Sequence, residues 1–133
     1  MPLIAVKRVL KPWGYELIWA HTEHYVGKLL HINAGQALSV QYHNQKDETI
    51  FLLRGRMKYR VGSGVGGRGS GEGLEEGREA VEREEGQSFR NTPGTVHQMI
   101  AITDCDVLEA STPHLDDVVR LVDRYGREGT SAP

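Results

Sequence analysis

Four side chains of types that commonly bind transition metals occur at two places in the sequence: Gln41, His43 and Glu48, and later His97. One residue separates Gln41 from His43, so an extended strand would direct both side chains to the same face. A turn over residues 44–47 would then bring Glu48 back on a neighbouring strand. An amide oxygen, two imidazoles and a carboxylate form a mixed nitrogen and oxygen set that suits a borderline divalent cation. The residues alone leave two interpretations open: a metal site, or ordinary polar groups near strand ends.

The segments that must position these residues have the pattern of short β-strands. They are apolar, β-branched or alternating runs, and Gly and Pro interrupt them at close intervals. The predicted strands cover residues 25–32, 38–43, 49–53, 57–61, 88–91, 96–102 and 106–110. Many short strands with such punctuation predict an all-β sandwich or barrel. The clearest helical candidate is short, near residues 114–121.

Length and composition predict one domain over residues 1–133. The chain has a mass of 14.8 kDa, with 38% hydrophobic and 26% charged residues, enough for a core. A net charge of -2 and a pI near 6.3 argue against a protein that binds nucleic acid or a membrane surface. The single cysteine, Cys105, rules out an internal disulfide framework and suits a reducing compartment. We therefore expect a cytoplasmic protein, with Cys105 in an exposed turn between two aspartates.

Residues 62–85 are unusually rich in glycine and glutamate. No apolar periodicity can be drawn through this segment, and glycine carries the largest backbone entropy in an unfolded chain. The segment is predicted to be a flexible surface insertion.

Two motifs in the sequence resemble the two-motif signature of the cupin superfamily. The first has the form G-x5-Q-x-H-x4-E-x6-G and spans residues 35–55, and the second spans residues 86–97 and ends at His97. The resemblance implies a double-stranded β-helix, also called a jelly roll. It also implies that Gln41, His43, Glu48 and His97 bind one divalent transition metal, with Zn, Ni, Fe and Mn as candidates.

Three stretches are similar, more narrowly, to the cupin domain of type II mannose-6-phosphate isomerases: Lys-Pro-Trp-Gly at 11–14, residues 38–43 and residues 116–127. This resemblance implies a metal-dependent sugar-phosphate isomerase that interconverts mannose 6-phosphate and fructose 6-phosphate in carbohydrate metabolism. It implies that Arg120 and Arg127 bind the phosphate, and that the protein is a homodimer. No nucleic-acid or membrane partner is expected.

Two further residues are candidates for moving the proton between the sugar carbons. Lys28 alternates with Leu30 and Ile32, so it should face the interior, either as a site residue or as a stem that reaches the barrel mouth. Glu109 lies in a predicted strand and is either a general base or a residue of the rim. For Arg120 and Arg127 the other interpretation is a solvated tail paired with nearby aspartates.

The chain departs from the isomerase pattern in its first motif. Asn44 and Gln45 stand where the family often has further histidines, Lys46 stands where it has arginine, and threonine follows Glu48. These differences keep open a non-catalytic cupin that binds a metal or a sugar. A non-haem iron dioxygenase is the third reading, although Gln41 fits its usual histidine-rich ligand set less well.

Overall fold

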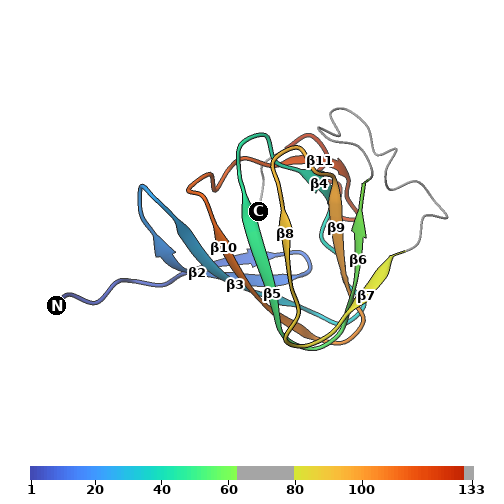
Figure 1. Cartoon of the computed structure of the whole chain (residues 1–133), viewed down its shortest axis with the longest axis horizontal. Helices are drawn as coiled ribbons and strands as arrows, with labels where there is room; N and C mark the ends of the chain where they lie inside the picture. Colours follow the sequence, from blue (N-terminus) through green and yellow to red (C-terminus); the bar gives the residue numbers. More distant parts are fainter. Residues whose placement is uncertain (63–79, 131–133) are drawn as a thin grey trace.

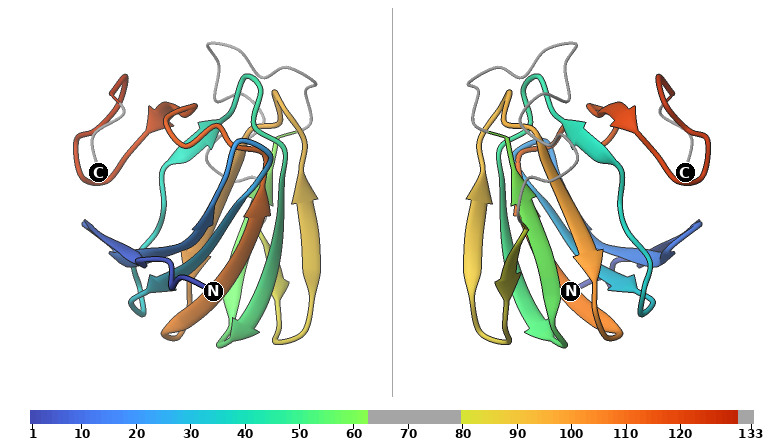
Figure 2. Two further views of the ribbon diagram at one scale, coloured as in Figure 1. Left: turned by 90° about the vertical axis from the view of Figure 1, so that its left-hand side faces the viewer. Right: turned by 90° about the vertical axis from the view of Figure 1, so that its right-hand side faces the viewer.

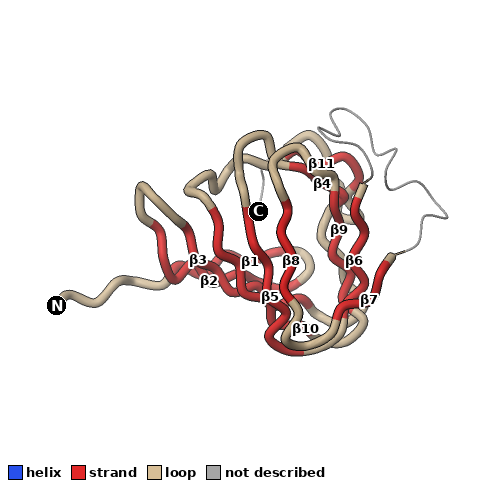
Figure 3. Tube along the Cα trace, in the orientation of Figure 1, coloured by secondary structure: helices blue, strands red, loops and turns tan. Residues whose placement is uncertain are grey.

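The computed structural model describes residues 1–62 and 80–130, which form eleven β-strands and no helix (Figure 3). A six-stranded sheet has the order β1 (Lys7–Lys11), β2 (Gly14–His21), β3 (Val26–Ile32), β10 (Cys105–Ser111), β5 (Glu48–Arg54) and β8 (Ser88–Asn91). A five-stranded sheet has the order β11 (Val119–Val122), β4 (Val40–Tyr42), β9 (His97–Ala101), β6 (Met57–Val61) and β7 (Val81–Arg83). All the strand pairings are antiparallel. The all-β prediction is confirmed.

The two sheets face each other and enclose one core (Figures 1 and 2). In β5, the side chains of Glu48, Ile50 and Leu52 are buried while their neighbours are more exposed, as the alternation along a half-buried strand requires. The largest wholly buried apolar side chains of this core are Ile32, Ile50, Leu52, Met57 and Met99. The core therefore fills one part of the space between the sheets, and charged residues line the rest.

The glycines of the two sequence motifs all have a positive φ, at turns between strands: Gly35, Gly55, Gly86 and Gly94. At Gly55, which joins β5 to β6, a Cβ atom would lie 2.2 Å from the carbonyl oxygen of Asp104. At Gly94, the backbone N–H donates to the carbonyl oxygen of His43 over 2.7 Å. The second of these turns thus ties the β8–β9 connection directly to a residue of the predicted metal site.

The helix predicted near residues 114–121 is wrong. Residues 112–118 form a loop, and Val119–Val122 is the strand β11, paired with β4. The Asp117 carboxylate accepts hydrogen bonds from the backbone N–H groups of residues 44–46, and this anchors the loop to the turn between β4 and β5. Val119 and Leu121 pack against an apolar cluster on β4, so a period of two, and not a helical period, satisfies this sequence.

Cys105 does not lie in an exposed turn. It is the first residue of β10 and is wholly buried, and its thiol donates to the carbonyl oxygens of Arg56 and Thr103. Burial raises the pKa of this thiol. The flanking Asp104 and Asp106 are more exposed, so the alternation of a strand edge explains the mixed local sequence.

Of the predicted insertion at 62–85, the structure describes Gly62 and residues 80–85. Within that part Val81–Arg83 forms β7 and pairs with β6, and Glu85 accepts a hydrogen bond from the backbone of Gly55. The remaining residues of the segment lie outside the described part. Among the described residues there is no helix that is long and apolar enough to span a membrane.

Candidate metal centre

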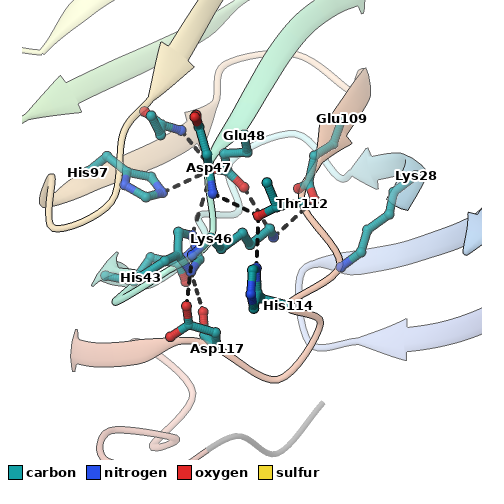
Figure 4. A network of polar contacts seen from close by, with 12 residues as sticks. Lys28, His43, Lys46, Asp47, Glu48, His97, Glu109, Thr112, His114 and Asp117 are labelled. Atoms are coloured by element: carbon teal, nitrogen blue, oxygen red, sulfur yellow. Dashed lines mark hydrogen bonds and ion pairs between the residues drawn. The ribbon is translucent and has the colours of Figure 1, made fainter. Parts of the chain in front are cut away.

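Three of the predicted ligands, His43, Glu48 and His97, come together between the two sheets (Figure 4). His43 follows β4, Glu48 begins β5 after the turn at 44–47, and His97 begins β9. The turn at 44–47 crosses from one sheet to the other, and this brings residues of both sheets to one point. Each of these three residues is at most 3% exposed.

One carboxylate oxygen of Glu48 faces both imidazole rings. Its Oε2 lies 3.7 Å from Nε2 of His43 and 3.4 Å from Nε2 of His97. One ligand atom can be chosen from each residue such that all three lie within 4.8 Å of one another. The cluster could therefore hold a metal ion.

The other nitrogen of each ring faces a backbone carbonyl. Nδ1 of His43 is 2.5 Å from the carbonyl oxygen of Asp117, and Nδ1 of His97 is 2.9 Å from that of Thr95. A carbonyl oxygen only accepts hydrogen bonds, so each Nδ1 carries the hydrogen. A neutral ring then presents its Nε2 lone pair to Glu48, and neither buried Nε2 has a hydrogen-bond partner in the described structure. Two lone pairs facing a carboxylate fit a bound cation, and outer hydrogen bonds of this kind are typical of metal-binding histidines.

Glu48 is held by two further residues. Asn91 donates from its side-chain amide to Oε2 over 2.8 Å, and the Lys46 ammonium lies 3.1 Å from Oε1. Burial alone would raise the pKa of Glu48, but the Lys46 ammonium beside it acts in the opposite direction, and that pKa lies well below its ordinary value. The carboxylate is therefore ionised, as a metal ligand must be.

Gln41, the fourth predicted ligand, lies beside this cluster. It is opposite His97 in the pairing of β4 with β9, and opposite Arg120 in the pairing of β4 with β11. Its Oε1 accepts a hydrogen bond from the Ser39 hydroxyl over 2.6 Å. Gln41 lines the same cavity as His43 and Glu48, and its role as a ligand stays a prediction.

The cavity next to the cluster has a volume of about 210 Å³ and contains all four predicted catalytic residues. Lys28 faces the interior, as its alternation predicts, and lies 3.3 Å from Oε1 of Glu16. Glu109 stands directly opposite Lys28 in the pairing of β10 with β3, and its Oε2 lies 3.0 Å from the Lys46 ammonium. Lys46 thus bridges Glu109 and Glu48, and these two carboxylates raise its pKa even though burial opposes that shift.

Arg120 and Arg127 are buried in the same cavity wall, not solvated in a tail. Arg127 forms a two-pronged ion pair with Asp123, at 2.7 Å and 3.0 Å, and Arg120 donates to the carbonyl oxygen of Thr130 over 2.8 Å. Each guanidinium still has a buried nitrogen with no hydrogen-bond partner in the described structure: Nε of Arg120 and Nη1 of Arg127. Burial, and next the charge of Arg127, lower the pKa of Arg120. Both arginines of the cavity wall therefore keep a cationic donor without a partner in the described structure.

Sequence reasoning missed three residues that line this cavity, Lys11, Glu16 and Lys46, and it missed Asn91, which donates to Glu48. Lys11 and Glu16 belong to the hairpin of β1 and β2, which was not predicted. The alternation of Lys7, Val9 and Lys11 is the signal that could have revealed it. Asn91 ends a predicted strand, and only the register of β8 against β5 places it opposite Glu48.

No protein-family profile and no curated protein sequence matches the chain. Solved structures do match. KdgF from Halomonas sp. is 18% identical with a TM-score of 0.62, over 83% of this chain and 88% of its own. An RmlC-like cupin protein from Desulfovibrio desulfuricans is 23% identical with a TM-score of 0.56, over 74% of this chain and 80% of its own. The chain has the cupin fold.

The cupin fold is the predicted double-stranded β-helix, so that prediction is confirmed. A third match, the oxalate decarboxylase of Bacillus subtilis, has Mn(II) centres. It is 15% identical with a TM-score of 0.61, over 80% of this chain and 27% of its own. At these identities the likeness concerns the fold, and the His43, Glu48 and His97 cluster is this chain's own evidence for a metal.

Proposed function

We propose that the protein is a metal-dependent sugar-phosphate isomerase of the mannose-6-phosphate isomerase type. The observation that supports this most is one cavity lined by two kinds of group: His43 and Glu48 of the buried His–Glu–His cluster, and Arg120 and Arg127, which each have a buried guanidinium nitrogen with no hydrogen-bond partner in the described structure. A guanidinium is well suited to bind phosphate through paired hydrogen bonds. Such a cavity suits a small molecule with a phosphate at one end and oxygens for a metal at the other.

His43, Glu48 and His97 would hold one divalent ion, with Gln41 as a fourth ligand if its oxygen turns away from Ser39. When bound, such an ion supplies Lewis acidity that polarises a carbonyl or hydroxyl oxygen of the sugar. Lys46 and Asn91 hold the Glu48 carboxylate in place, and Arg120 and Arg127 would orient the substrate through its phosphate.

Glu109 is the better candidate for the general base. It would take the proton from C2 of the aldose and return it to C1, while the O2 hydroxyl proton passes to O1. Lys28 is occupied by its ion pair with Glu16, so it suits a cationic hydrogen-bond donor more than a base. The Lys46 ammonium, 3.0 Å from Oε2, holds the Glu109 carboxylate in place.

Two other functions are supported by specific observations. Two histidines and one carboxylate match the facial triad of non-haem iron oxygenases, since the Gln41 oxygen is engaged by Ser39. Asn44 and Gln45 stand where the isomerase family often has histidines, and their backbone amides donate to the Asp117 carboxylate. The site therefore lacks these histidines, which favours a non-catalytic binding protein. Iron content together with substrate-dependent oxygen uptake would identify the first, and a bound metal without turnover the second.

We also propose a homodimer located in the cytoplasm. The open edges of both sheets are available for a second copy.

Elemental analysis of the purified protein beside an isomerase assay tests the proposal. We expect about one transition metal per chain and turnover of mannose 6-phosphate, with much less turnover of mannose. Arg120→Met should keep the metal and reduce kcat/KM for the phosphorylated sugar roughly a hundredfold, because a charge-assisted contact is lost. Arg56→Met, at an exposed arginine, is the matched control. Metal without turnover of any sugar phosphate would contradict the isomerase.

A further inference from the structure

Three charged side chains form a row on the cavity-facing side of β1, β2 and β3: Lys11, Glu16 and Lys28. The Lys11 ammonium is 4.0 Å and the Lys28 ammonium 3.3 Å from Oε1 of Glu16. Burial lowers the pKa of Lys11, and the nearby charges of Lys28, Arg120 and Arg127 lower it further, while Glu16 opposes the shift. Glu16 therefore lies between two lysines, and Arg120 and Arg127 are close enough to act on the same group.

Glu16 uses only half of its hydrogen-bonding capacity. Both lysines approach the same carboxylate oxygen, Oε1. Within the described residues, no hydrogen bond reaches Oε2, although the residue is 7% exposed and lines the cavity. A carboxylate oxygen that receives no hydrogen bond, on a residue that lines a cavity, can accept hydrogen bonds from a ligand in that cavity.

The charge of Glu16 works against a plain anion. A carboxylate near Arg120 reduces the attraction that this guanidinium group exerts on phosphate. A ligand regains that loss only if it brings hydroxyl groups, because a hydroxyl can donate to Oε2 and accept from the Lys11 or Lys28 ammonium at the same time.

We propose that Glu16 is a specificity-determining residue, whose Oε2 accepts hydrogen bonds from hydroxyl groups of the substrate and selects a polyhydroxylated anion over a simple one. The proposal rests on the proposed function for the phosphate end of the ligand. The proposal adds that the ligand has hydroxyl groups between its phosphate and the metal. It assigns the recognition of these hydroxyl groups to the hairpin of β1 and β2.

Calorimetry with two probes, fructose 6-phosphate and inorganic phosphate, tests this role. Binding of each probe is measured with the purified metal-loaded protein and with the same protein after chelation. Wild type should bind the sugar phosphate at least tenfold more tightly than inorganic phosphate. Glu16→Gln keeps the size of the side chain and removes the charge. It should bind inorganic phosphate several-fold more tightly and the sugar phosphate about tenfold more weakly, so the preference is lost.

Two variants separate recognition from a purely structural role. Glu16→Asp keeps the charge but withdraws the oxygen. It should therefore weaken the binding of the sugar phosphate and leave the affinity for inorganic phosphate unchanged. Glu82→Gln, at an exposed glutamate paired with Arg56, should change neither affinity. If Glu16 only positions the lysines, Glu16→Gln will bind both probes more weakly. This result would overturn the proposal.

The outcome also differs from that of the proposed function. A wild-type protein that shows the preference for sugar phosphate but no isomerase activity supports the role of Glu16 and contradicts the isomerase. A wild-type protein that binds the two probes equally, or binds neither, contradicts the role of Glu16 whatever its activity.

Discussion

At the scale of single residues, the centre depends on where the hydrogens of two imidazole rings lie. The carbonyl oxygens of Asp117 and Thr95 fix the Nδ1 hydrogens of His43 and His97, and both Nε2 atoms are left for a cation. Each carbonyl belongs to the loop before a strand, β11 or β9, so the ligand geometry depends on loops that the two sheets hold in place.

His97→Ala should lose the metal, because one of three buried ligands disappears and the Glu48 carboxylate then faces a single imidazole. We expect affinity for Zn²⁺ to fall by at least about a hundredfold, measured by competition with a chromogenic chelator. His24→Ala, at an exposed histidine, is the control and should keep the metal. A His97→Ala protein with full metal content would show that the cluster is not the binding site.

The sequence was sufficient to predict that His43, Glu48 and His97 lie together, because they stand in two motifs that resemble those of cupins. Lys46 and Glu16 leave no such pattern. Their importance comes from ion pairs with Glu109 and Lys28, which lie far away in sequence, and only the strand register brings them together.

At the scale of elements, the C-terminal segment closes one side of the cavity. After β11, the chain turns back and the Asp123 carboxylate accepts three hydrogen bonds from Arg127, one from its backbone and two from its guanidinium. This ion pair holds Arg127 in the cavity wall. The segment thus positions a residue proposed to bind the substrate, and it does so without a helix.

The same pair predicts a pH dependence of stability. Burial alone would raise the pKa of Asp123, but the hydrogen bonds and charge of Arg127 outweigh it and lower that pKa. A lowered carboxyl pKa stabilises the folded state above the unfolded pKa of about 3.9, and this contribution is lost as the pH falls through the folded pKa. Asp123→Asn should therefore reduce the free energy of unfolding by about 1–3 kcal/mol at pH 7 and equally at pH 5.

Urea denaturation of wild type and Asp123→Asn at pH 7, 5 and 3.5 measures this effect. The difference between the two proteins should begin to narrow at pH 3.5, because below the unfolded pKa the unfolded wild-type chain takes up a proton at Asp123. Asp116→Asn, whose exposed side chain has no hydrogen bond in the described structure, should match wild type at every pH. A constant difference between pH 7 and 3.5 would show that the ion pair is not what Asp123 contributes.

Elements with apolar alternation were predictable, whereas β1, β2 and β11 were not. In these three strands charged residues such as Lys11, Glu16 and Arg120 take cavity-facing positions where a strand normally places apolar ones. The hydrophobic pattern is weakest where the strands line the candidate site, and for this reason sequence reasoning replaced β11 with a helix.

At the scale of the whole molecule, several apolar side chains remain uncovered near β1 and β2. Leu10 is 70% exposed and Trp19 is 52% exposed, with the indole packed over Gly27. Leu3 and Ile4 are also exposed, in the N-terminal segment that extends away from the sheets in Figure 1. Exposed apolar groups gathered in one region are typical of an interaction surface.

If a second copy covers this region, light scattering should give a mass twice the 14.8 kDa of the chain. Leu10→Glu should shift the protein to monomers, because it places a charge on the covered surface without changing the buried side of β1. Val81→Glu, at an exposed position on β7 in the other sheet, should remain dimeric. A wild-type protein that is monomeric at all concentrations would contradict the homodimer.

The place of β10 in the larger sheet has a consequence for folding during synthesis. This strand lies between β3 and β5, yet it is translated long after both. Glu109, the cross-strand neighbour of Lys28, is therefore absent when β3 is made. At ribosomal rates the delay is on the order of ten seconds. Throughout it, the nascent chain exposes the facing edges of β3 and β5, so folding of this sheet is delayed until β10 has been made. High contact order of this kind slows folding, and we expect the newly made chain to depend on chaperones more than the finished protein does.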